Sequence, residues 1–264
     1  MKLDYATLIS PYPFRLEGIG SIKSPTLKEI WDPSVTYQGY QMYLTLLLMT
    51  PQTYYEQTGL FRSEWFQTIS EDELQNINMM DLIAVDGNLQ KMYCKMFQFF
   101  FEETIQYDDG NHVFITYKDK IQDGAKSEKN LSMGTIRRDM FVELCDIILQ
   151  RCNILRTDLD TDISKIKSKR ALEIVKKLKK GREKASKNTT HDKDIELPNL
   201  ITSVAVKSNS INFTNIWDLT VFQLYEQFKK EQTNVYFDIQ KMSVAAYGNE
   251  KNTFKGNEWY KSEN

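Results

Sequence analysis

Residues 214–242, TNIWDLTVFQLYEQFKKEQTNVYFDIQKM, hold the longest helical pattern in the chain and set its fold class. Apolar and aromatic residues recur there at three- and four-residue steps, which is the repeat of one helix face. The members of this stripe are Trp217, Val221, Leu224, Tyr225, Phe228, Val235, Ile239 and Met242. The pattern predicts a long amphipathic helix that begins near Thr214 and runs past Met242.

Helical spacing also dominates much of the preceding sequence. Residues 34–49 predict a helix that Ser34 caps and Pro51 stops. Residues 54–81 favour several short helices, and residues 135–152 favour one longer helix with apolar positions on one stripe.

The N-terminal 33 residues carry four of the six prolines and two glycines. Proline fixes its own φ and biases the residue before it toward extended geometry. We therefore expect residues 1–33 to form a proline-rich arm with a short strand near 14–22. Ser24 is expected to cap a short helix that has Pro25 at its first position.

The least helical part of the sequence is the segment 82–117. Residues 104–107 and 113–117 are rich in β-branched and aromatic residues, and they flank the turn Asp108-Asp109-Gly110-Asn111. This pattern predicts a β-hairpin in which the Asp-Gly pair supplies positive φ. A lone hairpin is marginal, so it should pair with a strand at 92–100 or lie on helices. The expected fold class is mainly α with a small β-hairpin element.

A basic helix is expected over residues 165–184, where ten Lys or Arg face two Glu, a net charge of +8. The basic side chains are Lys165, Lys167, Lys169, Arg170, Lys176, Lys177, Lys179, Lys180, Arg182 and Lys184. Three readings stay open: a solvated face that docks on the chain's own acidic remainder, a surface for a protein partner, or a nucleic-acid patch. No aromatic residue interleaves with the charges to stack on bases, so nucleic acid is the least favoured.

These patterns give three regions. Residues 1–33 are the arm, residues 34–160 together with 195–264 are expected to share one helical core, and residues 161–194 are a basic helical insertion.

The composition is that of an ordinary globular chain of 264 residues with a net charge of −2. No apolar run approaches the roughly 20 residues that a bilayer-spanning helix needs, and the first residues lack the pattern of a secretory signal. Three cysteines without a CxxC spacing fit buried thiols in a reducing compartment. We therefore expect the protein to act in a cytoplasm.

Motifs for catalysis are weak. The two histidines, His112 and His191, have no neighbours at metal-ligand spacing, and Gly18-x-Gly20 lacks the third glycine of a dinucleotide fingerprint. We expect no enzyme activity, no cofactor and no metal site.

The sequence has 14 Tyr, 14 Phe and 4 Trp, and most of these should be buried. Aromatic residues left at the surface favour an interface with another protein. The candidates for binding a partner are Tyr37, Tyr40, Tyr43, Tyr54, Tyr55, Trp217 and Tyr225.

Both ends of the chain resemble a known family. The N-terminal residues are Leu16-Glu17-Gly18-Ile19-Gly20, then Ser24-Pro25-Thr26-Leu27-Lys28-Glu29-Ile30, then a Tyr-rich helix that ends at Thr50-Pro51. The C-terminal residues are Ile216-Trp217-Asp218-Leu219-Thr220, Gln223-Leu224-Tyr225, Phe228, and Met242-Ser243-Val244-Ala245-Ala246-Tyr247-Gly248. This combination resembles the tail assembly chaperones of tailed bacteriophages and prophages of low-GC Gram-positive hosts.

The resemblance implies a non-enzymatic protein that coats the helical tape-measure protein in the host cytoplasm and leaves when the tail tube polymerises. Self-association is possible in this picture, and no membrane is involved. Two alternatives remain open, a structural virion protein of the tail or baseplate and a nucleic-acid-binding protein that uses the basic helix. The family defines no catalytic or ligand residue that could be carried over.

Overall fold

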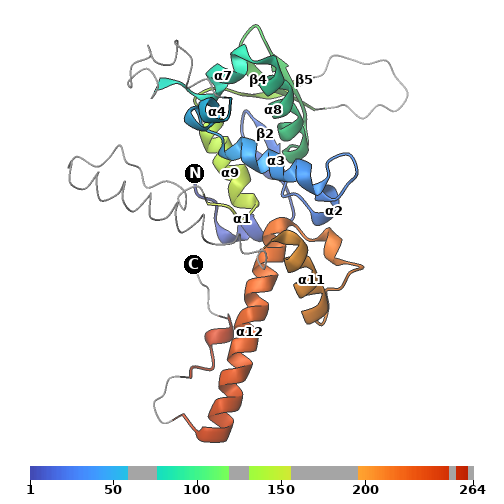
Figure 1. Cartoon of the computed structure of the whole chain (residues 1–264), viewed down its shortest axis with the longest axis vertical. Helices are drawn as coiled ribbons and strands as arrows, with labels where there is room; N and C mark the ends of the chain where they lie inside the picture. Colours follow the sequence, from blue (N-terminus) through green and yellow to red (C-terminus); the bar gives the residue numbers. More distant parts are fainter. Residues whose placement is uncertain (59–75, 119–130, 156–195, 250–253, 261–264) are drawn as a thin grey trace, which may run out of the picture. The chain divides into compact units, whose positions relative to one another are not determined.

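The computed structural model describes residues 1–58, 76–118, 131–155, 196–249 and 254–260 (Figure 1). The chain divides into two compact units, Met1–Leu159 and Asp160–Asn264, and each is described by itself. Helices dominate, and two small antiparallel sheets complete the fold. The predicted fold class, mainly α with a small β element, is confirmed.

The first unit has a helical part and a small β part. In chain order its elements are α1 (Tyr5–Ile9), β1 (Phe14–Leu16), β2 (Gly20–Ile22), α2 (Leu27–Ile30), α3 (Tyr37–Leu48), α4 (Pro51–Thr58), α7 (Met79–Val85), α8 (Gly87–Phe100), β3 (Thr104–Asp108), β4 (Val113–Lys118), β5 (Leu131–Ile136) and α9 (Phe141–Arg151). Helix α3 packs against both α8 and α9, and α8 also contacts β3 (Figure 1).

Helix α8 provides the aromatic centre of this unit. Its buried residues, Leu89, Tyr93, Met96, Phe97 and Phe100, recur at three- and four-residue steps. Of the two alternatives for the hairpin, pairing with a strand at 92–100 is wrong, because this apolar run has the repeat of a helix face that is buried along its whole length. The other alternative, that the hairpin lies on a helix, agrees with the contact between α8 and β3. The Asp86 carboxylate accepts hydrogen bonds from the backbone at the helix start, which fixes where α8 begins.

The predicted hairpin is confirmed as β3 and β4, and β5 pairs with the other edge of β4. Two details differ from expectation. The positive φ in the turn belongs to His112 (53°) rather than to Gly110. Residues 131–136, expected as loop and helix start, form β5, so that α9 begins only at Phe141.

Helix starts also differ by a few residues. Thr36 rather than Ser34 caps α3, and Thr26 rather than Ser24 caps α2 in a capping box with Glu29. Pro51 begins α4, where its missing N–H costs no helical hydrogen bond.

The N-terminal 33 residues are built into the first unit rather than lying apart from it. The Arg151 guanidinium of α9 is buried and donates to the carbonyls of Thr7 (3.2 Å), Ser10 (3.4 Å) and Tyr12 (2.7 Å). The side chain of Gln150 accepts a hydrogen bond from the Leu3 N–H at 2.8 Å. These contacts tie the start of the chain to a helix more than 130 residues away in sequence.

A second anchor holds the loop between β1 and β2 against the larger sheet. The Thr135 N–H donates to the Gly18 carbonyl at 2.9 Å, and the Thr116 hydroxyl donates to the carbonyl of Ile19. A Cβ atom at Gly134 would overlap the backbone of Gly18 and Ile19. Glycine is therefore required here by the close approach of two backbones.

The second unit consists of α11 (Leu197–Lys207), the short helix η5 (Ile216–Asp218), the long helix α12 (Val221–Tyr247) and η6 (Glu258–Tyr260). Helix α12 begins later than expected, because Thr220 forms a capping box with Gln223. As predicted, the helix runs past Met242, and it ends at Gly248 with φ of 79°.

The predicted basic helix at 165–184 lies outside the described residues. The prediction that residues 34–160 and 195–264 share one core stays a prediction.

We predict that Gly134→Ala destabilises the first unit by about 3 kcal/mol, because backbone atoms cannot yield as a flexible side chain could. Thermal and urea unfolding followed by circular dichroism would measure the loss. Gly39→Ala is the matched control: in α3 a Cβ there meets only the Thr36 hydroxyl at 3.6 Å, so this change should leave stability equal or slightly higher. Equal effects of the two substitutions would contradict the close-approach argument.

Candidate partner-binding groove

A groove lies between α11 and α12 within the second unit and has a volume of about 400 Å³. Its lining is mostly apolar, with polar groups at its borders. The lining residues are Ser203, Val204 and Lys207 from α11, and Phe228, Glu231, Gln232, Val235, Tyr236 and Ile239 from α12. The groove lies beside the last turns of α11 and extends along α12 from Phe228 to Ile239.

The unequal lengths of the two helices create this groove. Helix α11 has 11 residues and α12 has 27, so at 1.5 Å per residue α12 is longer by about 24 Å. Ser208 ends α11 in an extended conformation (ψ 143°). The last turns of α11 therefore lie beside Val235 and Ile239, which line the groove with Val204 and Lys207, whereas Met242 lies outside this lining.

The apolar stripe predicted from the sequence divides at this point. Its first half packs inside the unit, where Val221 and Leu224 are fully buried. Its second half lies at the surface, with exposed fractions of 38% for Val235, 56% for Ile239 and 65% for Met242. A single sequence pattern thus supplies both core and exposed apolar surface.

The opposite face of the distal α12 is covered by the chain itself. At 3.6 residues per turn, Phe237 and Val244 lie roughly opposite the exposed stripe, and both are half-buried. The Phe237 ring packs on Phe254 with 5.2 Å between centroids, and the Asn249 side chain bonds the Phe254 backbone. Helix η6 also contacts α12. The exposed stripe is therefore the face of distal α12 that these contacts leave open.

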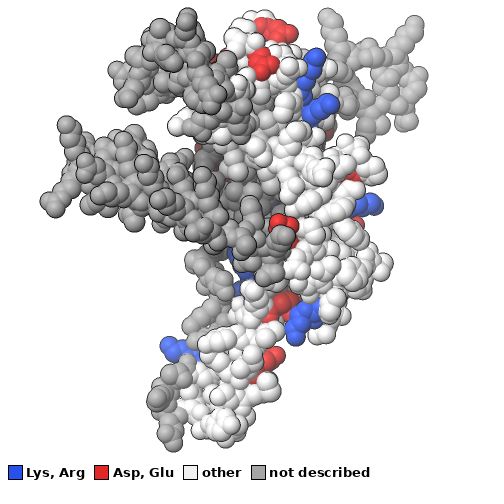
Figure 2. All heavy atoms as spheres, viewed as in Figure 1, with Lys and Arg blue, Asp and Glu red and all other residues white. Residues whose placement is uncertain are grey.

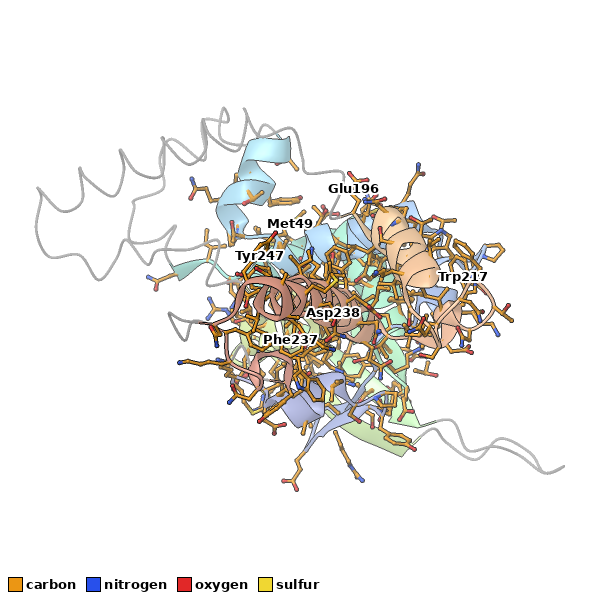
Figure 3. The ribbon with its side chains drawn as sticks, turned by 90° about the horizontal axis from the view of Figure 1, so that it is seen from below. Met49, Glu196, Trp217, Phe237, Asp238 and Tyr247 are labelled. Carbon is orange, nitrogen blue, oxygen red and sulfur yellow. The ribbon has the colours of Figure 1, made fainter. Side chains whose placement is uncertain are left out.

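Charges border the exposed stripe unevenly. Glu231 and Asp238, seven residues apart, lie along one edge, and Gln232, Tyr236 and Ser243 along the other. Glu231 accepts a hydrogen bond from Gln227 at 3.0 Å. Figure 2 shows mostly uncharged surface on this part of the chain, with scattered acidic and basic groups. Figure 3 looks from below and labels Asp238 on α12 together with Phe237, Tyr247 and, beyond α11, Trp217.

The aromatic candidates from the sequence lie in different settings. Tyr40, Tyr43 and Tyr55 are buried, so their rings belong to the core of the first unit. Tyr37 is half-buried and stacks on Trp31, with centroids 4.9 Å apart. Tyr54 donates its hydroxyl hydrogen to Asp86 at 2.9 Å. Burial and this hydrogen bond raise the pKa of Tyr54 to about 12, so the hydroxyl stays neutral near pH 7.

The two candidates in the second unit are half-buried. The Trp217 indole N–H donates to the Phe213 carbonyl at 3.0 Å, and Tyr225 lies on the proximal half of α12. Neither residue lines the groove, so a role in binding stays a prediction for both.

The sequence stripe contained three of the groove residues, Phe228, Val235 and Ile239. It missed Val204 and Tyr236: Val204 comes from another helix, and Tyr236, three residues before Ile239, was not assigned to the stripe. Only the packing of α11 on α12 brings them together.

Within the described ranges, no cluster of three or more metal-ligating side chains occurs, and no helix is both long and apolar enough to cross a bilayer. All three cysteines are free thiols, and burial raises the pKa of Cys152 to about 12. A thiol with such a pKa is inert at neutral pH, which fits the packing role predicted for it.

A second cavity of about 360 Å³ lies in the first unit beside Met49 and Phe141. Its polar wall includes Arg138, whose guanidinium pairs with both carboxylate oxygens of Asp81 at 2.9 and 3.1 Å. The Arg138 guanidinium also donates to the Asn76 carbonyl at 2.6 Å. The Arg138 guanidinium is therefore already bonded to groups of the first unit itself.

Comparison with known proteins places one similarity on the unit that carries the groove. Residues 186–264 match the family described as the YomV second domain, which is phage-related, and this match points to a phage or prophage protein. It covers less than a third of the chain. No curated protein and no solved structure matches the chain.

We predict that truncations at the two halves of the α12 stripe differ in their effect on stability. Leu224→Ala should lower the free energy of unfolding by about 3 kcal/mol, because it opens a cavity in packed surroundings. Ile239→Ala should change it by less than about 0.5 kcal/mol, because the side chain is already largely in water. Urea titrations of both variants test this, and a large loss for Ile239→Ala would show that its side chain is covered.

Proposed function

We propose that the protein is a non-enzymatic phage tail assembly chaperone that binds the tape-measure protein during tail morphogenesis. The exposed apolar stripe on α12, continuous with the groove beside α11, is the observation that carries this proposal. The phage-related match on residues 186–264 and the resemblance of both chain ends to tail assembly chaperones support it.

The physical need for such a protein follows from the nature of its partner. An extended helical protein that exposes apolar faces aggregates unless they are covered. A groove between two helices, lined by aliphatic and aromatic side chains, is suited to receive one face of an amphipathic helix.

Such binding must also be reversible, because the tail tube has to replace the chaperone. From Phe228 to Met242 the stripe is about 21 Å long, which is about four turns of helix. A contact of this size falls in the range of weak or transient interfaces rather than of permanent ones.

We predict that the tagged protein co-purifies with the tape-measure protein from cells that produce phage, and that finished particles lack it. Ile239→Ser combined with Met242→Ser should reduce the recovered tape-measure protein about tenfold, since each removes an exposed apolar anchor. Val206→Ser is the matched control, because Val206 is 77% exposed on α11 but does not line the groove.

Quantitative mass spectrometry of purified particles decides between this proposal and its main alternative. Stoichiometric presence in particles would make the protein a structural component of the tail or baseplate. The nucleic-acid alternative would be favoured by DNA binding that weakens steeply as the salt concentration rises. Such binding should also be lost when four lysines of the basic helix are neutralised, namely Lys176, Lys177, Lys179 and Lys180.

A further inference from the structure

We infer that the groove and the distal stripe of α12 select an amphipathic helix with basic residues along one edge of its apolar face. This inference names the chemistry of the partner and rests on the proposed function only for the partner's biological role. The evidence is the uneven border of the stripe, acidic along one edge and uncharged along the other.

The acidic edge comes from helix geometry. In an α-helix, residues seven apart lie on nearly the same side, so Glu231 and Asp238 form one row about 10 Å long beside Val235 and Met242. Asp238 is exposed. On the other edge, Gln232, Tyr236 and Ser243 carry no charge.

A helix bound on the stripe would place one of its edges beside this acidic row. Opposite charges there favour Lys or Arg on the incoming helix, and Asp or Glu there would be repelled. Lys207 lines the groove only at the end of α11. Asp238, rather than the part of the groove near Lys207, should therefore contribute most to the preference for a basic edge on the bound helix.

A second copy of this chain fits the stripe less well. In an antiparallel two-fold pair of α12 helices each edge meets the same edge of the second copy, which would oppose the two acidic rows. In a parallel pair the acidic row would meet the uncharged edge, and no opposite charge would result. The charge pattern thus points to a different polypeptide.

The chain's own C-terminal segment is engaged elsewhere. Phe254 packs on Phe237, which lies on the face of α12 opposite the stripe. A segment held there does not also cover Ile239.

The test uses two designed helical peptides of about 18 residues with the same Leu face and with either Lys or Glu along one edge. Fluorescence anisotropy with the full chain should give a dissociation constant of about 10 µM for the Lys peptide and binding at least about tenfold weaker for the Glu peptide. Asp238→Lys should reverse this order. The exposed acidic control, Asp218→Lys, should leave it unchanged, because Asp218 precedes α12 and lies outside the groove.

Several outcomes would overturn the inference. Equal binding of the two peptides, or a preference unaffected by Asp238→Lys, would remove the role of the acidic edge. Self-association abolished by Ile239→Ser would make a second copy the occupant. The groove would also be shown not to serve a separate partner by either of two results. One is that a peptide of residues 165–184 binds the stripe more tightly than the Lys peptide. The other is that neither designed peptide binds.

Circular dichroism of each variant checks that the fold is retained, which is expected because Asp238 and Ile239 are both exposed. The peptide experiment needs no phage particles, so its result is independent of the proposed function. A protein found in finished virions would remove the chaperone role while leaving the peptide preference intact.

Discussion

An apolar helix face must be covered, and α12 is longer than the helix that covers it. Along its first turns, Val221 and Leu224 are buried, and the second unit gains its core there. Beyond Phe228 the same face lines the groove beside the end of α11 and becomes exposed at Ile239 and Met242, while Phe254 packs on the opposite side. Exposed apolar surface of this size costs free energy in water. Its presence on an otherwise well-formed helix is the physical basis for the proposal that this unit binds a partner.

The two units are stabilised by different kinds of contact. The first relies on contacts between segments far apart in sequence: the Arg151 guanidinium holds three carbonyls near the N terminus, and Gly134 allows the Gly18 loop to reach the sheet. The second rests mainly on neighbouring helices, with Thr220 capping the longer one. Local capping and a simple apolar repeat are sufficient for α12, whereas the first unit requires specific long-range pairing.

Because local signals can be read from sequence and long-range contacts cannot, only part of the fold could be predicted. The α12 stripe, the hairpin and the helix-dominated class could be read from period and turn chemistry, because these signals are local. The strand expected at 92–100 failed because α8 is buried along its aromatic face, where β-like composition hides a helical repeat. The groove itself could not be found, since Val204 and Tyr236 come together only through packing. Tyr40 and Tyr55 were candidates for binding a partner but are buried, because the presence of an aromatic residue in the sequence does not show whether it lies in the core or at the surface.

The guanidinium of Arg151 has a further consequence for how the chain is made. The carbonyls that it binds, from Thr7 to Tyr12, leave the ribosome about 140 residues before their donor does. Until α9 has been synthesised, the first dozen residues lack the hydrogen bonds that Gln150 and Arg151 supply, and closing so long a loop carries an entropic cost. Folding of the first unit is therefore coupled to translation of its last helix. A ribosome paused before residue 151 would expose an N-terminal segment open to proteases.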